Sequence, residues 1–329
     1  MKKLAAAILS VLLVFSLFGC GEPAKTEAKT YNVGVTIYKF DDNFMTLYRN
    51  DIKADFDALK TDTVSYNVSI VDANNDMNQQ TEQVNTFISQ KVDVMIVNLV
   101  QTSSGATIGK LCADAGIPVV FINREMADYT YPDNQCYVGA DAKMSGSFQG
   151  QIIYNLTNHG DINGDGKVSY VMIMGDPENS DAQYRTEYSI KYLTDNGVTV
   201  NELYKQTGNW DQAKGQELVA TALAQFGKDI EVVFCNNDAM ALGAYQAIKA
   251  AGRTVGKDIY LVGVDALTEC VQMVKDGTMT GTVLNDDAGQ AKAAVETAVG
   301  YINGTKPAKT VAYVDYVMVT KDNADQYLK

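Results

Sequence analysis

The sequence has few basic residues, few prolines and a single histidine. Its 27 Lys and Arg stand against 40 Asp and Glu, which gives a formal net charge of -13. A phosphate backbone would be repelled by such a chain, so the composition argues against nucleic-acid binding. Five Pro and 26 Gly exclude collagen-like and proline-rich disordered chains. His159 has no serine or cysteine partner nearby in the sequence, and we expect a surface residue and not a catalyst.

Cysteine is also scarce, at five residues. No two of them form a Cys-x-x-Cys motif, so redox and metal sites with that spacing are absent. Apart from Cys20, the four that remain could pair in three ways in an oxidising compartment: Cys112, Cys136, Cys235 and Cys270. We expect buried free thiols, because Cys235 ends an apolar run in which a small hydrophobic side chain fits.

The first thirty residues carry a targeting signal. Lys2 and Lys3 precede an apolar run over residues 4–19, which is typical of an export signal. A polar stretch follows at once, and this disfavours a permanent membrane-spanning helix. The run ends in Leu-Phe-Gly-Cys20, which resembles a bacterial lipobox. We predict a signal peptide over 1–20, lipidation of Cys20 and a polar tether over 21–30, with an unlipidated cysteine as the alternative. The protein is then extracytoplasmic and contacts the membrane through its lipid anchor alone.

The rest of the chain alternates short β-branched runs with amphipathic stretches. With 329 residues it is long enough for about two domains. Strands are predicted at 33–37, 64–71, 94–100, 118–122, 168–174, 198–204, 231–235, 258–264 and 280–284, and helices at 44–59, 77–90 and 104–115. Such alternation is typical of βαβ units, in which a parallel sheet is covered by helices on both faces. We therefore predict two α/β lobes.

Asp and Asn residues follow many of these predicted strands. Ligands of open α/β sheets bind at the carboxyl ends of the strands. Helix capping explains such residues equally well, and we assign it to Asp41, Asn236, Asp238 and Asp286. Capping does not explain why both lobes also place aromatic residues and an arginine there, namely Tyr38, Phe44, Trp210 and Arg185. This mixture suits a neutral polyol, because amides and carboxylates bind hydroxyls and aromatic rings cover C–H faces.

Six blocks of the sequence carry a family resemblance: 34–44, 98–100, 118–121, 236–240, 263–267 and 281–286. They resemble the bacterial D-galactose/D-glucose-binding proteins, which are type I periplasmic binding proteins of ABC sugar importers, and the similarity extends from Tyr31 to Tyr327. The resemblance implies two similar Rossmann-like lobes with parallel sheets, joined by a hinge of three segments near Ala140, 285–287 and 312–314. The first lobe would comprise 31–140 and 286–313, and the second 141–285 and 314–329.

The resemblance also implies a sugar site between the lobes. Its contacts fall on Tyr38, Asp42, Phe44 and Asn98 in the first lobe, on Asp181, Arg185, Trp210, Asn237 and Asp265 in the second, and on Asn285 near a crossing. Phe44 and Trp210 would sandwich the sugar ring. Asp42 would accept the 4-hydroxyl in either epimer. The family has a histidine where this chain has Asn179, whose amide can still donate to a hydroxyl, so the ranking of glucose against galactose stays open.

Residues 161–169 follow the calcium-loop pattern of EF-hands. Oxygen-bearing side chains occupy positions one, three, five and nine, and Gly166 occupies position six. Position twelve is Met172, which cannot supply a carboxylate, and the resemblance implies Glu231 in its place. The predicted Ca²⁺ ligands are Asp161, Asn163, Asp165, Lys167 through its carbonyl, Ser169 and Glu231. Because a strand and not a helix follows, the site would be structural; a metal-free turn is the alternative.

These observations favour a monomeric binding protein and not an enzyme. It would capture D-galactose or D-glucose and deliver it to the membrane subunits of an ABC importer, with a chemoreceptor as a second candidate partner. One alternative is a glycosidase that uses Asp42 and Asp181 as its carboxylate pair. Another is a binding protein for a different monosaccharide. A transcriptional regulator would need an N-terminal helix-turn-helix, where this chain has an export signal.

Overall fold

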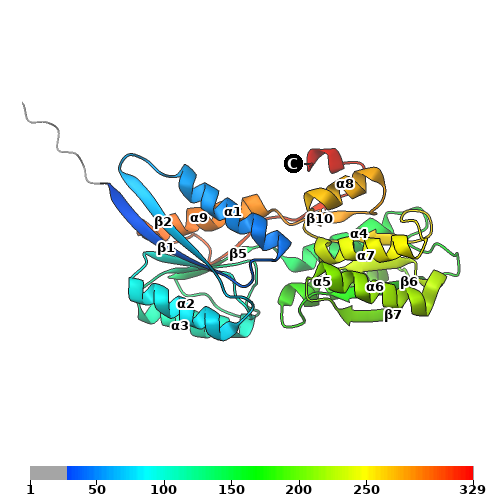
Figure 1. Ribbon diagram of the computed structural model, residues 1–329, viewed down its shortest axis with the longest axis horizontal. Helices are drawn as coiled ribbons and strands as arrows, with labels where there is room; N and C mark the ends of the chain where they lie inside the picture. The colour runs from blue at the N-terminus through cyan, green and yellow to red at the C-terminus, as the bar shows by residue number, and fades with distance from the viewer. Residues whose placement is uncertain (1–27, 329) are drawn as a thin grey trace, which may run out of the picture.

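The computed structural model describes residues 28–328, which form two lobes lying side by side (Figure 1). The predicted signal peptide, the lipidation site Cys20 and residues 21–27 of the predicted tether lie outside the described residues. The first strand, β1, begins at Lys29, so residues 29 and 30 belong to the first lobe and not to a tether.

The first lobe is built on a six-stranded sheet with the order β11-β5-β4-β3-β1-β2, in which all neighbours are parallel. Its strands are β1 (Lys29–Ile37), β2 (Val64–Asp72), β3 (Val94–Val97), β4 (Val119–Ile122), β5 (Gln135–Gly139) and β11 (Val311–Tyr313). The middle strands are buried along their whole length, because helices cover both faces of the sheet. One face carries α1 (Asn43–Ala58) and α9 (Asp287–Ile302), and the other α2 (Met77–Gln90) and α3 (Gly105–Asp114).

The second lobe repeats this plan with a four-stranded parallel sheet of order β7-β6-β8-β9. Its strands are β6 (Val168–Met174), β7 (Val200–Thr207), β8 (Val232–Cys235) and β9 (Tyr260–Val262). Helices α4 (Ala142–Tyr154) and α5 (Ser180–Asp195) cover one face, and α6 (Gln212–Phe226) and α7 (Asp238–Ala250) the other. After α8 (Thr268–Asp276), the strand β10 (Thr282–Leu284) lies beside the end of β9 and pairs antiparallel with β12 (Val317–Val319).

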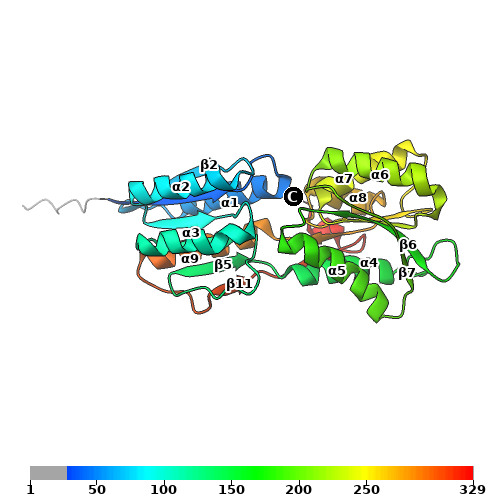
Figure 2. The ribbon, with the colours of Figure 1, turned by 90° about the horizontal axis from the view of Figure 1, so that it is seen from below.

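The chain passes between the lobes at three places. They lie between β5 and α4, between β10 and α9, and between β11 and β12. Seen from below, the chain that leaves β5 runs directly to the second lobe (Figure 2). The predicted two-lobed α/β fold is therefore confirmed, and the third crossing follows Tyr313, within the expected segment 312–314.

The sequence pattern missed three strands, β5, β11 and β12. Two of them have only three residues, and β5 (Gln-Cys-Tyr-Val-Gly) lacks the β-branched run by which the other strands were recognised. The predicted strands 94–100 and 258–264 are shorter in the structure, ending at Val97 and Val262. In both cases the apolar sequence continues into a buried loop, so hydrophobicity alone did not mark the strand end.

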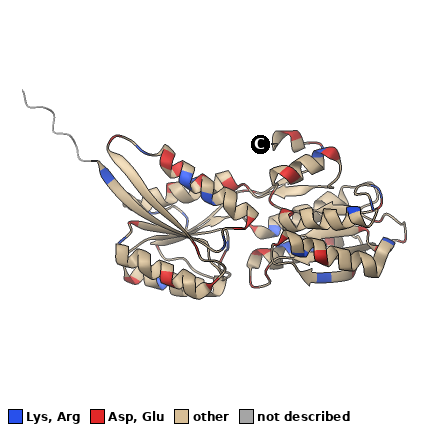
Figure 3. Ribbon diagram, viewed as in Figure 1, with Lys and Arg blue, Asp and Glu red and all other residues tan. Residues whose placement is uncertain are grey.

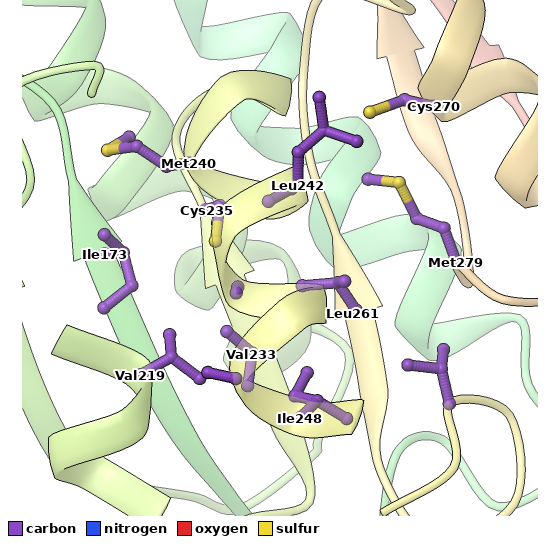
Figure 4. Packing of buried hydrophobic residues seen from close by; sticks show 14 of the residues in the cluster. Ile173, Val219, Val233, Cys235, Met240, Leu242, Ile248, Leu261, Cys270 and Met279 are labelled. Atoms are coloured by element: carbon purple, nitrogen blue, oxygen red, sulfur yellow. The ribbon is translucent and has the colours of Figure 1, made fainter. Parts of the chain in front are cut away.

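The cysteines lie in the cores of the two lobes. Figure 4 shows Cys235 and Cys270 among apolar side chains of the second lobe, including Val233 and Leu261. All four described cysteines are buried and free, which confirms the prediction. Burial raises the pKa of Cys112 to about 12, so this thiol is not reactive at neutral pH.

Basic and acidic residues are intermixed in both lobes in the ribbon of Figure 3. His159 is exposed and stacks on the ring of Tyr154, which confirms it as a surface residue. None of the helices within residues 28–328 is long and apolar enough to cross a bilayer.

Candidate functional site

A polar cavity lies between the two lobes and is lined by residues of both. Ten of the eleven predicted sugar contacts line it: Tyr38, Asp42, Phe44, Asn179, Asp181, Arg185, Trp210, Asn237, Asp265 and Asn285. Three further lining residues were not predicted: Met45, Asn123 and Arg124.

Asn98 is the predicted contact that does not line the cavity. It is fully buried behind the wall, where its Oδ1 accepts from the Tyr38 backbone N–H at 3.2 Å. Its Nδ2 donates to Asn123 Oδ1 at 3.1 Å. Asn98 therefore positions two lining residues.

Asn123 and Arg124 could have been found from the sequence, because they follow β4 directly and the ligand side of a parallel sheet is at its strand ends. Arg124 is 2% exposed and its guanidinium lies 3.6 Å from the centroid of the Tyr38 ring. Its Nη1 donates to the Val100 carbonyl. Met45, in the first turn of α1, carried no comparable signal.

In the first lobe, Tyr38 and Asp42 form the polar part of the wall. The Tyr38 hydroxyl donates to Asp42 Oδ2 at 2.6 Å, while Asp42 Oδ1 accepts from the Met45 N–H at 2.8 Å and caps α1. Burial, together with the neighbouring carboxylate, raises the pKa of Tyr38, so the phenol stays protonated. Each carboxylate oxygen accepts one such bond and has a second lone pair available to a ligand hydroxyl.

In the second lobe, a buried arginine organises the wall. Arg185 Nη2 lies 3.3 Å from Asp181 Oδ2, and its Nη1 lies 3.8 Å from Asp265 Oδ1. Nη1 also donates to the Asn236 carbonyl at 2.8 Å, and Nη2 to the Tyr316 hydroxyl at 3.1 Å. Burial raises the pKa of Asp181 and Asp265, and the guanidinium opposes part of that rise. Arg185 thus offsets part of the negative charge of these two carboxyl groups within the wall.

Three buried donors of the wall have no hydrogen-bond partner among the described residues: Arg124 Nε, Arg185 Nε and Trp210 Nε1. Leaving a buried donor unsatisfied costs about 1–3 kcal/mol. A ligand rich in hydroxyl oxygens would supply acceptors for them. The apolar rings of Phe44 and Trp210 border the same cavity, so it offers both apolar faces and polar groups.

Several lining residues have a left-handed backbone. Asn123 has φ 62°, Trp210 φ 66° and Asp265 φ 120°, and Ala266 follows with φ 53°. Such conformations cost about 1–3 kcal/mol each for residues other than glycine and persist only where neighbouring contacts hold them. The wall is therefore positioned by its surroundings and not by local preference.

Direct contacts close the cleft on one side of the cavity. Ser180 Oγ donates to the Glu125 carbonyl at 3.1 Å, and Arg124 Nη1 lies 3.9 Å from Asp176 Oδ2. These pairs join the loop after β4 in the first lobe to the loop before α5 and the first residue of α5 in the second. The structure is thus a closed arrangement of the lobes.

The predicted helix caps are only partly confirmed. Asp286 does cap α9, accepting from the Gly289 N–H at 3.0 Å. The cap of α7 is Asn237, so the assignments of Asn236 and Asp238 as caps were wrong. Asn236 Oδ1 instead accepts from the Gly175 N–H at 2.9 Å, because α7 begins one residue further along the chain. Asp238 is the first residue of the helix and its carboxylate points into the core.

Asp41 was also assigned wrongly as a cap. It pairs with Lys39 at 3.0 Å on the surface, and the cap of α1 is the next residue, Asp42. Asn179, predicted as a sugar contact, caps α5 by accepting from the Asp181 N–H at 2.9 Å while it lines the cavity. Asp42, Asn179 and Asn237 each combine a cap with a position in the wall.

The buried carboxyl group of Asp238 predicts how the free energy of unfolding changes with pH. Burial raises its pKa to about 7, although Thr282 and the Leu267 N–H donate to it and oppose the rise. An unfolded Asp ionises near pH 4, so between about pH 4 and pH 7 the folded state holds a proton that the unfolded state has lost. Raising the pH through this window therefore lowers the free energy of unfolding. We expect Asp238→Asn to gain stability relative to the parent, by a few kcal/mol, as the pH rises from about 4 to 7.

Urea unfolding of both proteins across this pH range measures that difference. A difference that stays constant with pH would show that folding does not raise the pKa of Asp238.

The predicted calcium residues form a compact loop. Glu231 is 1% exposed, and its Oε1 accepts from the Ile162 and Asn163 N–H groups at 2.7 and 3.0 Å. Its Oε2 accepts from the Ser169 N–H at 2.8 Å. Asp161 accepts from Gly164 and Gly166 within the loop. The atoms that would bind the metal are all oxygens, as Ca²⁺ requires. Residues 28–328, however, contain no group of three or more Asp, Glu, His or Cys side chains close enough to hold a metal ion.

Comparison with known proteins places this geometry in a family. A periplasmic binding protein domain matches residues 33–306. The D-galactose/methyl-galactoside binding periplasmic protein of Haemophilus influenzae is 36% identical over 345 aligned positions, covering all of both chains. A putative rhizopine-binding protein of Rhizobium meliloti is 34% identical, with 99% of each chain covered. An ABC transporter solute binding protein from Bacillus halodurans, solved with bound myo-inositol, superposes with a TM-score of 0.80 at 29% identity, over 93% of this chain and 99% of that one. The chain therefore belongs to the periplasmic binding protein family.

Proposed function

We propose that this protein captures D-galactose and D-glucose between its lobes and delivers the sugar to an ABC permease. The observation that carries the proposal is the cavity between the lobes. Aromatic rings, carboxylates and unpartnered buried donors meet there from both lobes. A ligand that contacts both walls stabilises the closed arrangement over an open one, and a permease can recognise that difference.

The chemistry of the wall fits a hexopyranose. Asp42, Asp181 and Asp265 supply carboxyl oxygens as acceptors for sugar hydroxyls, and Arg124 and Arg185 supply donors for sugar oxygens. Phe44 and Trp210 supply apolar faces for the C–H patches of the ring. Each group binds the sugar without changing it, so the protein releases its ligand intact. The relatives named above are likewise described as binding proteins and not as enzymes.

The choice of sugar rests on this wall and on the Haemophilus relative, because other relatives are named for ribose and xylitol. Calorimetric titration with D-galactose, D-glucose, D-ribose and myo-inositol tests it. We expect the two hexoses to bind with micromolar dissociation constants, which corresponds to about 8 kcal/mol. Tight binding of ribose or inositol with no heat from either hexose would assign another ligand. Turnover of aryl galactosides would instead support a glycosidase.

We also propose an extracytoplasmic location, with lipid on Cys20 and residues 21–28 as the tether to the membrane. The motif at residues 17–20 supports this proposal, and mass spectrometry of the mature N-terminus tests it. The membrane subunits of the importer are the proposed partners, and a chemoreceptor is a further candidate. A monomer suffices, because one chain supplies both walls of the cavity.

A structural calcium ion is proposed for the 161–169 loop. Asp161, Asn163, Asp165, Ser169, Glu231 and the Lys167 carbonyl have the donor types that Ca²⁺ prefers, and the ion would add a cross-link between the loop and β8. We expect a chelator to lower the melting temperature by several degrees, and excess Ca²⁺ to restore it.

Glu231→Gln should melt lower in calcium and lose the response to chelator. Glu202→Gln, on the neighbouring strand β7, is the matched control and should keep it. Identical melting of the parent with and without chelator would show that the loop holds no metal.

A further inference from the structure

The buried carboxylate of Asp238 lies behind the wall of the cavity and not in it. Asp238 is 0% exposed and does not line the cavity. Its Oδ1 accepts from the Thr282 hydroxyl at 2.7 Å, and its Oδ2 accepts from the Leu267 N–H at 2.9 Å. Its own backbone N–H donates to the Val264 carbonyl at 2.7 Å. One residue thus ties together the start of α7, the 263–267 segment and strand β10.

The 263–267 segment is the one that presents Asp265 to the cavity. Asp265 and Ala266 both have positive φ, so this backbone needs outside support. Val264 and Leu267, on either side of these two residues, are both hydrogen-bonded to Asp238. Gly263 allows the close approach, since a Cβ there would lie 2.2 Å from Asp238 Oδ1.

Thr282 extends the same support to Ala266 and to the hinge. Its hydroxyl donates to Asp238 and accepts from the Ala266 N–H at 3.4 Å. Thr282 begins β10, which ends at Leu284, immediately before the crossing residue Asn285. Asn285 Nδ2 in turn lies 3.3 Å from Asp265 Oδ1.

We propose that Asp238, acting with Thr282, is a positioning residue of the ligand site: it holds the strained segment that aims Asp265 at Arg185 and the ligand. Without these hydrogen bonds, the segment relaxes toward negative φ and the Asp265 carboxylate leaves its place beside Arg185. Affinity then falls although every residue that touches the ligand is intact. This inference rests on the proposed sugar binding.

Four variants test the proposal by calorimetry with D-galactose, at a temperature where each is folded. Asp238→Ala removes both accepted bonds, and we expect an affinity loss of tenfold or more. Thr282→Val keeps the shape but removes the hydroxyl, with an expected loss of threefold or more. Thr282→Ser can keep the bonds, and Asp238→Asn can accept from the Leu267 N–H with its oxygen while its NH2 group donates to the Thr282 hydroxyl. We expect both variants to bind within threefold of the parent.

Val219→Ala separates positioning from general stability. Val219 is fully buried in the core of the same lobe, on α6, and does not line the cavity. This variant should melt lower than the parent and bind within twofold of it. Parent-like binding by both Asp238→Ala and Thr282→Val would overturn the proposal, as would an equal loss in Val219→Ala. If the parent itself bound no hexose, the sugar function would fail instead.

Discussion

Replacing Asp181 by alanine is expected to remove most of the affinity for hexose, by about 100-fold or more. Asp181 is 5% exposed and supplies carboxyl oxygens as acceptors to the cavity. Its loss deletes that acceptor and also leaves Arg185 without a carboxylate that lies 3.3 Å away. Truncating one partner of a buried, hydrogen-bonded charge pair in a binding interface costs about 2–5 kcal/mol of binding free energy, which is about 30-fold to more than 1000-fold in affinity.

Two further variants test whether the loss of affinity is due to the missing acceptor at Asp181. Asp181→Asn keeps the shape and one acceptor oxygen, so its affinity should fall between those of the parent and Asp181→Ala. Asp195→Ala, at the other end of α5, removes an exposed carboxylate paired with Lys191 and should bind like the parent. If a folded Asp181→Ala protein bound galactose within threefold of the parent, the assignment of the cavity as the sugar site would be wrong.

Trp210→Ala is the second large effect we expect. Large aromatic residues that pack on a ligand are typical hot spots, and their truncation commonly costs about 2–4 kcal/mol, or about 30- to 1000-fold in affinity. Trp210 also carries one of the unpartnered buried donors, which its loss removes from the wall. Trp210→Phe keeps a ring and should retain part of the affinity. Normal binding by Trp210→Ala would exclude ring stacking at this position.

The position of the Trp210 ring can be tested without changing the tryptophan. Gly175 faces the indole so closely that a Cβ would lie 2.2 Å from Trp210 Cζ2. Gly175→Ala should therefore displace the ring and weaken sugar binding. Because Trp210 is the single tryptophan of the sequence, its fluorescence reports both the displacement and ligand binding directly.

Residues at strand ends show how far the sequence could predict this site. Tyr38, Asn237 and Asp265 follow predicted strands and line the cavity as expected. Asn98, which the sequence placed inside the predicted strand 94–100, follows β3 and braces the wall from behind, whereas Arg124, after β4, faces the cavity. Position at a strand end thus brings a residue near the ligand but does not decide which way its side chain points.

The helix caps show the same limit at the level of single residues. In Asn236-Asn237-Asp238, all three residues are good caps by type, and sequence alone could not choose among them. The packing of α7 against its sheet places the helix start after Asn237, which sends Asn236 to Gly175 and Asp238 to Thr282. Three consecutive residues therefore have three different roles: Asn237 caps α7, Asn236 accepts from the Gly175 N–H, and Asp238 accepts from Thr282 in the core.

The sequence by itself determined the α/β class, the two lobes and most strands, because these follow from the local periodicity of apolar residues. Only the tertiary structure decided the closed cavity, the short strands β5, β11 and β12, and the buried contacts of Asp238 and Arg185. The physical reason is that these features depend on residues far apart in the chain. Burial and hydrogen bonding between them outweigh the local preferences that a sequence pattern records.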